Sequence, residues 1–326
     1  MNFWVPFFQM IVLFGMMATG FFCYKKDWMD DSATSKLSRV VVNIFNPLLV
    51  INGVLGQSGS ADGGRIRENL MMVVAYFAIL ILFGYLIVAL LRPKKTEQTV
   101  YRLMSAFSNV GFMGIPVTKC VLGDEAVVYV AFYILVYNLL LYTYGTVLTR
   151  KAAAENGVTG GGGKGGAEDA GTAEGVVKKA LKQMMNPGVA ASLLAIIIFG
   201  AGIQMPDFVI SFCDYMGNAT VPLSMFLIGV TVAQADVKSM LGDVRTYLYI
   251  VLRMLALPIL LIVLMKRLPI DPVVFGVFII EIGMPVGGIV TIMTKESGAD
   301  ADCCTRGTVL STMASILTIP VICMFL

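Results

Sequence analysis

The stretch that says most about the fold covers residues 108–116 and reads Ser-Asn-Val-Gly-Phe-Met-Gly-Ile-Pro. It lies inside an apolar run that predicts one helix over residues 101–121. Proline removes a backbone donor and clashes with the carbonyl one turn back, and Gly111 and Gly114 loosen the helix further. The sequence therefore predicts a helix that is broken near its middle, within one turn of Gly114.

A similar stretch occurs in the second half of the chain. Residues 283–286 read Gly-Met-Pro-Val, residues 114–117 read Gly-Ile-Pro-Val, and the later stretch is preceded by Glu281. Backbone groups freed by a break cannot face lipid, so they must be buried in protein or line a polar cavity. Broken helices at corresponding places in two halves are typical of a transporter's substrate site. The alternative is that Pro and Gly only allow close helix packing.

Composition indicates a membrane protein. Of the 326 residues, 57% are hydrophobic and 14% charged, whereas soluble domains carry roughly 25% charged residues. Apolar runs of about twenty residues, enough for a helix to cross ~30 Å of hydrocarbon, recur along the chain. We predict an all-α membrane protein with ten transmembrane helices, at residues 3–24, 37–57, 70–91, 101–121, 126–149, 187–204, 208–233, 246–265, 272–293 and 304–325.

The segment at residues 150–186 divides these helices into two groups of five. It contains a glycine-rich run at residues 160–166 and has no apolar face, so we expect a flexible linker. The first five-helix repeat then covers residues 1–149 and the second residues 187–326. Because each has an odd number of helices, two similar repeats would be inverted relative to each other in the membrane.

The distribution of basic residues predicts the topology. Eighteen of the 24 Lys and Arg lie in or beside the odd-numbered loops and the linker, and four lie in even-numbered loops. The positive-inside rule then makes the linker cytoplasmic and both termini extracytoplasmic. Lys119 and Arg253 lie within spans. We expect Lys119 to snorkel toward a nearby acid, and Arg253 either to snorkel to the cytoplasmic face or to attract an anion. Basic residues this dispersed argue against a nucleic-acid partner.

Polar groups near the predicted breaks are candidates for the site. Asn109 can donate hydrogen bonds to a carboxylate without carrying a charge. Glu281 should face the protein interior or be protonated, because a charge at the bilayer centre costs roughly 2.5–3.5 kcal/mol on insertion scales. The predicted substrate-binding residues are Asn46, Asn109, Gly111, Gly114, Pro116, Asn138, Gly283 and Pro285, and Glu281 is the predicted ion-coupling residue.

Other chemistries lack their residues in this sequence. There is no histidine, and the six cysteines show no zinc or redox spacing. Ser-His hydrolysis and His-dependent zinc sites are thereby excluded. We expect no metal site, no cofactor and no enzymatic activity.

The chain resembles the auxin efflux carrier family of membrane transporters in its shorter prokaryotic form. The residues that carry the resemblance are 109–116, Asn-Pro-Leu-Leu at 46–49, and the stretches 284–300 and 310–320. It implies a ten-helix fold similar to bile-acid symporters and sodium/proton antiporters, with helices four and nine crossing at broken prolines. It also implies an elevator arrangement, with a scaffold domain of helices 1, 2, 6 and 7 and a transport domain of helices 3–5 and 8–10.

The resemblance implies small organic anions as substrates, such as auxin in plants and malate or malonate in bacteria. We expect a secondary-active efflux carrier that works by alternating access in the lipid bilayer, with proton coupling, sodium coupling or neither left open, and a homodimer through the scaffold helices. One departure is that Val286-Gly287-Gly288 follow Pro285 where many relatives have Asn, so a two-asparagine site does not carry over. The alternative function is a membrane receptor or scaffold that keeps the fold without transport.

Overall fold

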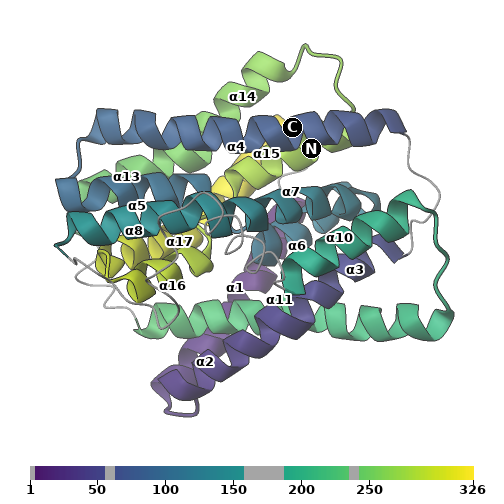
Figure 1. The fold of residues 1–326 in the computed structure, drawn as a ribbon, viewed down its shortest axis with the longest axis horizontal. Coiled ribbons are helices and arrows are strands. Elements are labelled where there is room, and N and C mark those ends of the chain that lie inside the picture. The colour runs from purple at the N-terminus through teal and green to yellow at the C-terminus, as the bar shows by residue number, and fades with distance from the viewer. Residues whose placement is uncertain (1–3, 56–62, 158–186, 235–241) are drawn as a thin grey trace, which may run out of the picture.

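The computed structural model describes residues 4–55, 63–157, 187–234 and 242–326 (Figure 1). Regular secondary structure within these ranges is helical, apart from one isolated antiparallel bridge between Ser108 and Val286. Most of the predicted linker, from residue 158 to residue 186, lies outside the described residues. The expectation that it is a flexible cytoplasmic segment therefore stays a prediction.

The helices follow the predicted runs closely, and several predicted spans consist of consecutive α and π segments. Those of the first half are α1 (Trp4–Lys25), α2 (Asp31–Val40) with η1 (Val41–Phe45) and α3 (Asn46–Leu55), α4 (Gly63–Leu91), α5 (Lys95–Ala106), η2 (Val110–Gly114) with α6 (Ile115–Leu122), the short η3 (Asp124–Ala126), and α7 (Val127–Leu140) with η4 (Leu141–Gly145) and α8 (Thr146–Glu155). Those of the second half are α10 (Pro187–Gly200), α11 (Asp207–Gln234), α13 (Val244–Val251) with η5 (Leu252–Ala256) and α14 (Leu257–Met265), α15 (Pro272–Gly283), α16 (Gly288–Ser297) and α17 (Ala301–Phe325).

Seven continuous helices among the described residues are long and apolar enough to cross a membrane. Three more apolar helices are shorter, at Val110–Leu122, Pro187–Gly200 and Pro272–Gly283. Large apolar side chains such as Val74, Leu82 and Phe208 are exposed on the outer surface, as expected for helices that face lipid. The chain is therefore a multi-pass, all-α membrane protein.

Proline accounts for three of the π-helical turns. The segments η1, η2 and η5 each end two residues before a proline, namely Pro47, Pro116 and Pro258. A proline ring clashes with the carbonyl four residues back and offers it no N–H. A wider turn just before the proline moves that carbonyl away, so each of these spans continues as a helix.

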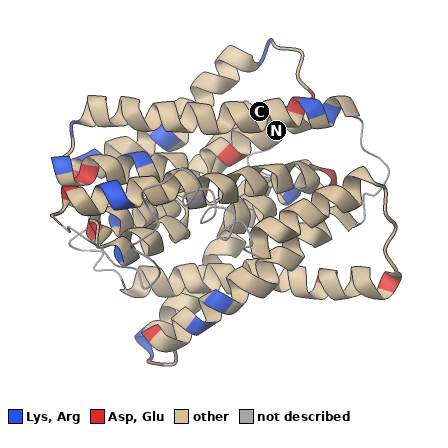
Figure 2. Ribbon diagram, in the orientation of Figure 1, with Lys and Arg blue, Asp and Glu red and all other residues tan. Residues whose placement is uncertain are grey.

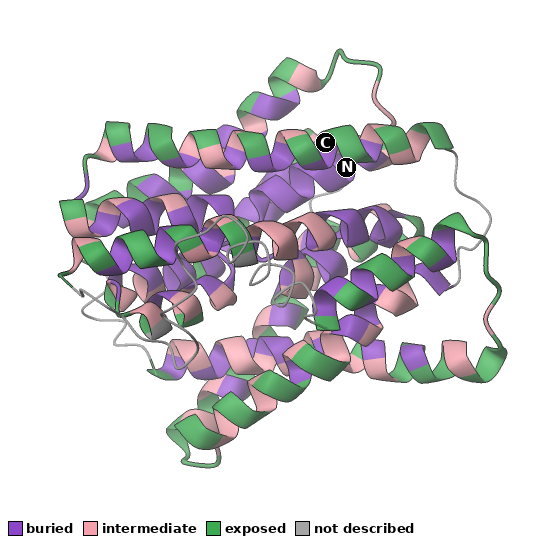
Figure 3. Cartoon of the chain, in the orientation of Figure 1, coloured by how far each residue is buried: buried purple, intermediate pink, exposed green. Residues whose placement is uncertain are grey.

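One group of helices packs around glycine contacts. α3 packs on α10 and on α11, and α1 runs along α11. The α1–α11 contact is very close, because a Cβ at Gly20 would meet the Phe226 carbonyl oxygen and a Cβ at Gly229 would meet that of Met17. The remaining helices pack on one another, with α5 against α4 and α8, and α17 against α13 and α16. Figure 3 shows that buried residues lie mainly on the facing sides of the helices.

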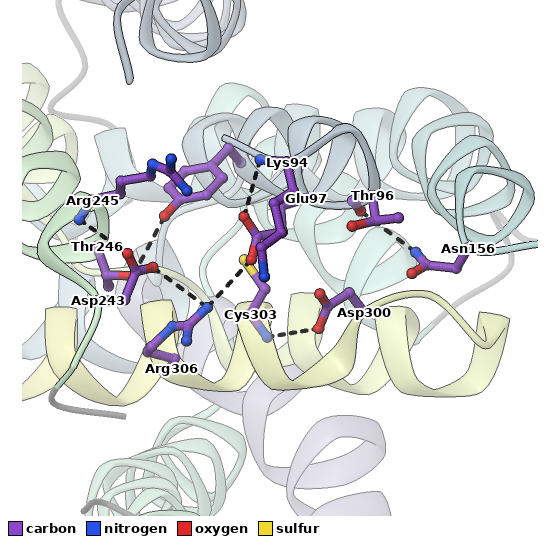
Figure 4. A network of polar contacts seen from close by, with 11 residues as sticks. Lys94, Thr96, Glu97, Asn156, Asp243, Arg245, Thr246, Asp300, Cys303 and Arg306 are labelled. Atoms are coloured by element: carbon purple, nitrogen blue, oxygen red, sulfur yellow. Dashed lines mark hydrogen bonds and ion pairs between the residues drawn. The ribbon is translucent and has the colours of Figure 1, made fainter. Parts of the chain in front are cut away.

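Most charged residues gather toward the margins of the view in Figure 2, and a few lie inside the bundle. One cluster of these joins α5, α17 and the start of α13 (Figure 4). There Arg306 forms ion pairs with Glu97 at 3.7 Å and Asp243 at 3.5 Å. Asp243 also accepts a hydrogen bond of 3.0 Å from Thr246 Oγ1. These ion pairs and hydrogen bonds link α5, α17 and the start of α13.

Candidate functional site

Two interrupted helices meet backbone to backbone at the centre of the site. Residues 107–109 separate α5 from η2, and residues 284–287 separate α15 from α16. The Asn109 N–H donates to the Pro285 carbonyl at 2.8 Å, and the Gly287 N–H donates to the Phe107 carbonyl at 3.0 Å. Each break therefore satisfies backbone groups of the other, which removes the cost of leaving them unpaired. We call residues 107–109 and 284–287 the crossover.

The two breaks differ in their relation to proline. The second begins directly after Gly283 and contains Pro285, as predicted. The first lies at residues 107–109, more than one turn before Gly114, so the predicted position of that break is wrong. The π-helical η2 accommodates Pro116 without interrupting the helix. The break itself is stabilised by the Asn109 cap and by backbone hydrogen bonds to residues 285 and 287 of the second break.

Asn109 serves as the N-cap of the helix that follows the first break. Its Oδ1 accepts a hydrogen bond of 3.3 Å from the Phe112 N–H. Asn is among the preferred residues at this position because its side-chain oxygen satisfies one of the unpaired amides of the first turn. The cap uses the amide oxygen, so the two Nδ2 hydrogens remain the groups with which Asn109 can bind a ligand.

A narrow cavity of about 90 Å³ adjoins the crossover. Four of the predicted substrate-binding residues line it: Asn46, Asn109, Gly111 and Asn138. Asn46 Oδ1 is buried and has no hydrogen-bond partner in the described part of the chain. Asn138 Nδ2 donates to the Ile134 carbonyl at 2.9 Å, within its own helix. The cavity holds space for several water molecules and is edged by amide groups.

Both helices that begin at the crossover point their N-terminal ends at this cavity. Val110, at the start of η2, and Gly288, at the start of α16, are both lining residues. The first amides of a helix have no partner within the helix, and the helix dipole places partial positive charge there. Such ends favour an anionic group.

Arg253 lies behind the crossover and contacts both breaks. Its side chain is 2% exposed, Nη2 donates to Ser108 Oγ at 2.5 Å, and Nη1 donates to the Ile282 carbonyl. Arg253 therefore does not snorkel to a membrane surface. No carboxylate among the described side chains forms an ion pair with it. The site contains a buried positive charge beside the cavity wall formed by Ser108.

Glu281 is completely buried on the other side of the crossover. Thr118 Oγ1 donates to Glu281 Oε1 at 3.3 Å, while Oε2 has no hydrogen-bond partner among the described residues. A Cβ added at Gly114 would meet both carboxyl oxygens, so this glycine lets the carboxyl lie against the helix backbone. The expectation that Glu281 faces the interior is confirmed.

The remaining predicted residues lie around the narrow cavity rather than in its wall. Gly114 contacts Glu281, Gly283 packs against Ile322, and Pro285 contributes its carbonyl to the crossover. Pro116 lines a second, wide cavity of about 900 Å³ together with the exposed Lys119. Asp214 also lines the wide cavity and accepts hydrogen bonds from Asn52 at 3.2 Å and Asn218 at 2.8 Å.

Sequence reasoning did not place Arg253 in the site. A signal was present, since Arg253 lies farther from the ends of its predicted span than any other basic residue. Hydropathy places such a residue along the helix but does not show which side it faces, and here the side chain turns inward to the breaks. The contribution of Gly287 to the crossover and the cavity wall was missed for a similar reason, because it has no side chain to suggest a role.

These features define a multi-pass helical membrane protein whose polar groups converge on two interrupted helices. The chain matches the family described as membrane transport protein over residues 6–323, nearly its whole length. It therefore belongs to this family of membrane transporters, which includes the auxin efflux carriers, and the resemblance found in the sequence is confirmed.

Two archaeal relatives extend over most of the chain. An uncharacterized transporter of Methanothermobacter thermautotrophicus is 23% identical over 297 residues, which cover 90% of this chain and 89% of the relative. An uncharacterized transporter of Methanocaldococcus jannaschii is 22% identical over 328 residues, covering 97% of each chain. Both are described as transporters, so the comparisons support membrane transport rather than an enzymatic function.

Proposed function

We propose that this protein is a secondary-active efflux carrier for a small organic anion, which binds in the narrow cavity beside the crossover. The observation that carries the proposal is the buried guanidinium of Arg253 behind the cavity wall, which forms no ion pair with any described carboxylate. A buried charge without a partner is costly, so the site is completed by a ligand of opposite charge. A carboxylate in the cavity supplies that charge.

Neutral donors at the site add to the attraction. Helix N-termini at Val110 and Gly288 present partial positive charge, and Asn109 retains its amide hydrogens for a ligand. These groups donate hydrogen bonds to carboxylate oxygens in a fixed geometry. Gly287 and Gly288 leave the second wall without side chains, so a ligand reaches the backbone amides there.

The arrangement of the helices supports alternating access. Both cavities lie between the group α1, α3, α10 and α11 and the helices around the crossover. The wide cavity is lined from α1, α3, α6, α11 and the start of α7. The narrow cavity is lined from η2, α7, η4 and α16 on one side and from η1, α3 and the start of α10 on the other. We take the first group as the scaffold domain, helices 1, 2, 6 and 7, and the rest as the transport domain. Relative movement of the two in an elevator mechanism would open the site to each side in turn.

The proposal includes ten spans in two inverted repeats. The interrupted pairs α5 with α6 and α15 with α16 each count as one span, and α10, about 21 Å long at 1.5 Å per residue, counts as another. The termini are extracytoplasmic and the linker is cytoplasmic.

Cysteine labelling in a Cys-free background tests this topology, with Lys164→Cys expected to react from the cytoplasm and Glu125→Cys from outside. Glu125 is a better probe than the neighbouring Gly123, because Gly123 has φ +91°, a backbone conformation that cysteine rarely adopts. The reverse pattern would overturn the topology.

Ion coupling and assembly complete the proposal. Glu281, buried without an ion pair beside the crossover, is the group that couples a proton or positions the site, whereas sodium coupling requires further oxygen ligands around it. The exposed surface of the scaffold helices provides a place for a homodimer.

A binding screen with charge-matched pairs tests the substrate class. Purified protein would be tested for thermal stabilisation by malonate, malate and indole-3-acetate, each against its neutral amide. We expect at least one carboxylate to stabilise the protein while its amide does not. Equal stabilisation by the amide would show that charge is not recognised and would refute the proposal. A receptor with the same fold also binds the anion, and transport separates it from a carrier.

A further inference from the structure

Four buried polar side chains lie in the region of the crossover and Glu281. Tyr76 on α4 and Tyr133 on α7 are both 0% exposed, as is Glu281, and Ser108 is 1% exposed. Neither tyrosine hydroxyl has a hydrogen-bond partner in the portion of the chain that is described, and Glu281 Oε2 also lacks one. Buried polar atoms are almost always hydrogen-bonded, so three unpartnered atoms in one region require an explanation.

These side chains lie near one another. The Tyr76 and Tyr133 rings pack edge to face with centroids 5.2 Å apart. Tyr133 lies within electrostatic range of Glu281, and Tyr76 lies within range of both Glu281 and Arg253. Tyr76 also lies near Ser108, without a hydrogen bond of regular geometry between them. Ser108 in turn bonds to Arg253 and lines the narrow cavity.

Glu281 forms no ion pair with a cationic side chain of the described residues. Lys119 on α6 is exposed and lines the wide cavity. Thr118 from α6 donates to it, Gly114 presents bare backbone, and Tyr133 and Tyr76 approach from α7 and α4. Arg253, from η5, bonds to the neighbouring Ile282 carbonyl rather than to the carboxyl. Helix α14 carries no charged residue, and on α17 the charged residues are Asp302 and Arg306, near its start at Ala301, far along the helix from Ile322, which packs on Gly283.

We propose that Ser108, Tyr76 and Tyr133 form a proton relay between the narrow cavity and Glu281. This inference rests on the proposed function, because it takes Glu281 as the residue that couples a proton to transport. Each hydroxyl accepts a proton on one side and releases its own on the other, directly or through an internal water molecule. A proton entering from water at Ser108 thus converts the Glu281 carboxylate to the carboxylic acid, and Ser108, Tyr76 and Tyr133 are unchanged. Reversal of these steps returns the proton to the cavity.

The relay gives the two sides of the crossover a shared function. Arg253 holds Ser108 at the entrance by the 2.5 Å hydrogen bond, so an anion that contacts this wall also changes access to the relay. Gly114 keeps the far end open, because any side chain there would occupy the space of the carboxyl. Coupling between anion and proton then requires no direct contact between the anion and Glu281.

The experiment measures hydrogen/deuterium exchange of the Glu281 carboxyl by infrared spectroscopy on the purified full-length protein without added anion. The carboxylic-acid band that disappears in Glu281→Gln belongs to Glu281. We expect this band at neutral pH, and we expect Tyr76→Phe and Tyr133→Phe to slow its exchange at least tenfold. Tyr101→Phe is the matched control, because Tyr101 is equally buried and its hydroxyl contacts Thr246 instead, 3.4 Å away.

The outcomes are distinct. Equal exchange rates in wild type, Tyr76→Phe and Tyr133→Phe would overturn the relay, as would the absence of a protonated Glu281 band. If a tyrosine variant does not fold, Ser108→Ala removes the entrance hydroxyl instead and must slow exchange similarly. The measurement uses no substrate, so failure of the relay leaves the anion carrier standing. Conversely, failure to transport any anion would leave the relay result unaffected.

Discussion

The amide of Asn109 and the carbonyl of Pro285 are joined by a hydrogen bond of 2.8 Å, which links two breaks from opposite halves of the sequence. Neither break is isolated in the membrane interior, because each provides the other's missing backbone partner. This contact also brings Asn109, two helix N-termini and the Ser108–Arg253 pair to one small cavity. Substitutions at these positions separate the structural role of these groups from their role in binding.

Asn109 has two functions that different substitutions distinguish. Asn109→Ala removes both the cap oxygen and the amide donors, whereas Asn109→Ser keeps a capping oxygen and removes the donors. We expect both variants to weaken anion binding about tenfold, equivalent to ~1.4 kcal/mol. Only Asn109→Ala should lower the free energy of unfolding, by about 1 kcal/mol. Thermal unfolding and anion titration check this; normal binding by Asn109→Ser would exclude its amide from the site.

Arg253 is expected to matter for binding more than for stability. Replacement by Met loses two hydrogen bonds of a charged group, about 1.5–3 kcal/mol each, but also removes a buried unpaired charge whose desolvation costs several kcal/mol. Arg253→Met should therefore unfold at a temperature equal to or above that of wild type and bind anions more than tenfold more weakly. Arg253→Lys should lie between them.

Arg306→Gln is the control for a basic residue away from the cavity. It loses the ion pairs to Glu97 and Asp243, so its unfolding temperature should fall while its anion affinity stays within twofold of wild type. If Arg253→Met instead lowers stability and binds anions normally, Arg253 is a structural link between the breaks and not part of the anion site.

Gly114 is required by the position of the Glu281 carboxyl. A methyl group at Gly114 overlaps both carboxyl oxygens, and overpacking of this kind costs about 1–3 kcal/mol. Gly15→Ala is the control, since a Cβ there meets no atom within 4 Å. In a double-mutant cycle, the cost of Gly114→Ala should largely vanish when Glu281 is also Ala. An equal cost in both backgrounds would mean that the strain lies in the backbone.

Glu281 should control the pH dependence of transport. The carboxyl can bind and release a proton, whereas the isosteric Gln cannot. We expect Glu281→Gln to bind anions within threefold of wild type and to transport them at a rate that no longer varies with pH. Proteoliposome uptake at a series of pH values measures this. A variant with the pH profile of wild type would remove Glu281 from the coupling mechanism.

The sequence predicted the helices better than the contacts between them. Apolar runs placed most of the helices within a few residues, because hydrocarbon thickness dictates their length. Pro285 marked its break correctly, yet Pro116 did not, since a π turn at residues 110–114 accommodates the proline. The first break depends on hydrogen bonds to residues 285 and 287 of the other half, and no local pattern contains that information.

The site was predicted in part for the same reason. Asn46, Asn109, Gly111 and Asn138 were expected near a break and do share one cavity. Arg253 was found in a span by its charge, but its inward direction depends on where the breaks lie. Tyr76 and Tyr133 have nothing in the sequence to distinguish them from other membrane tyrosines, and the relay proposed for them rests on their burial and their proximity to each other and to Glu281.

The central claim is that an organic anion crosses the membrane through the cavity beside the crossover, and uptake of radiolabelled anion by proteoliposomes tests it most directly. The carboxylate that stabilises the purified protein would be offered to liposomes containing wild type, Asn109→Ser or no protein. We predict saturable uptake by wild type that excess unlabelled carboxylate competes, and a loss of at least tenfold at low anion concentration in Asn109→Ser. Wild-type uptake no greater than that of protein-free liposomes, or undiminished uptake by Asn109→Ser, would contradict the claim.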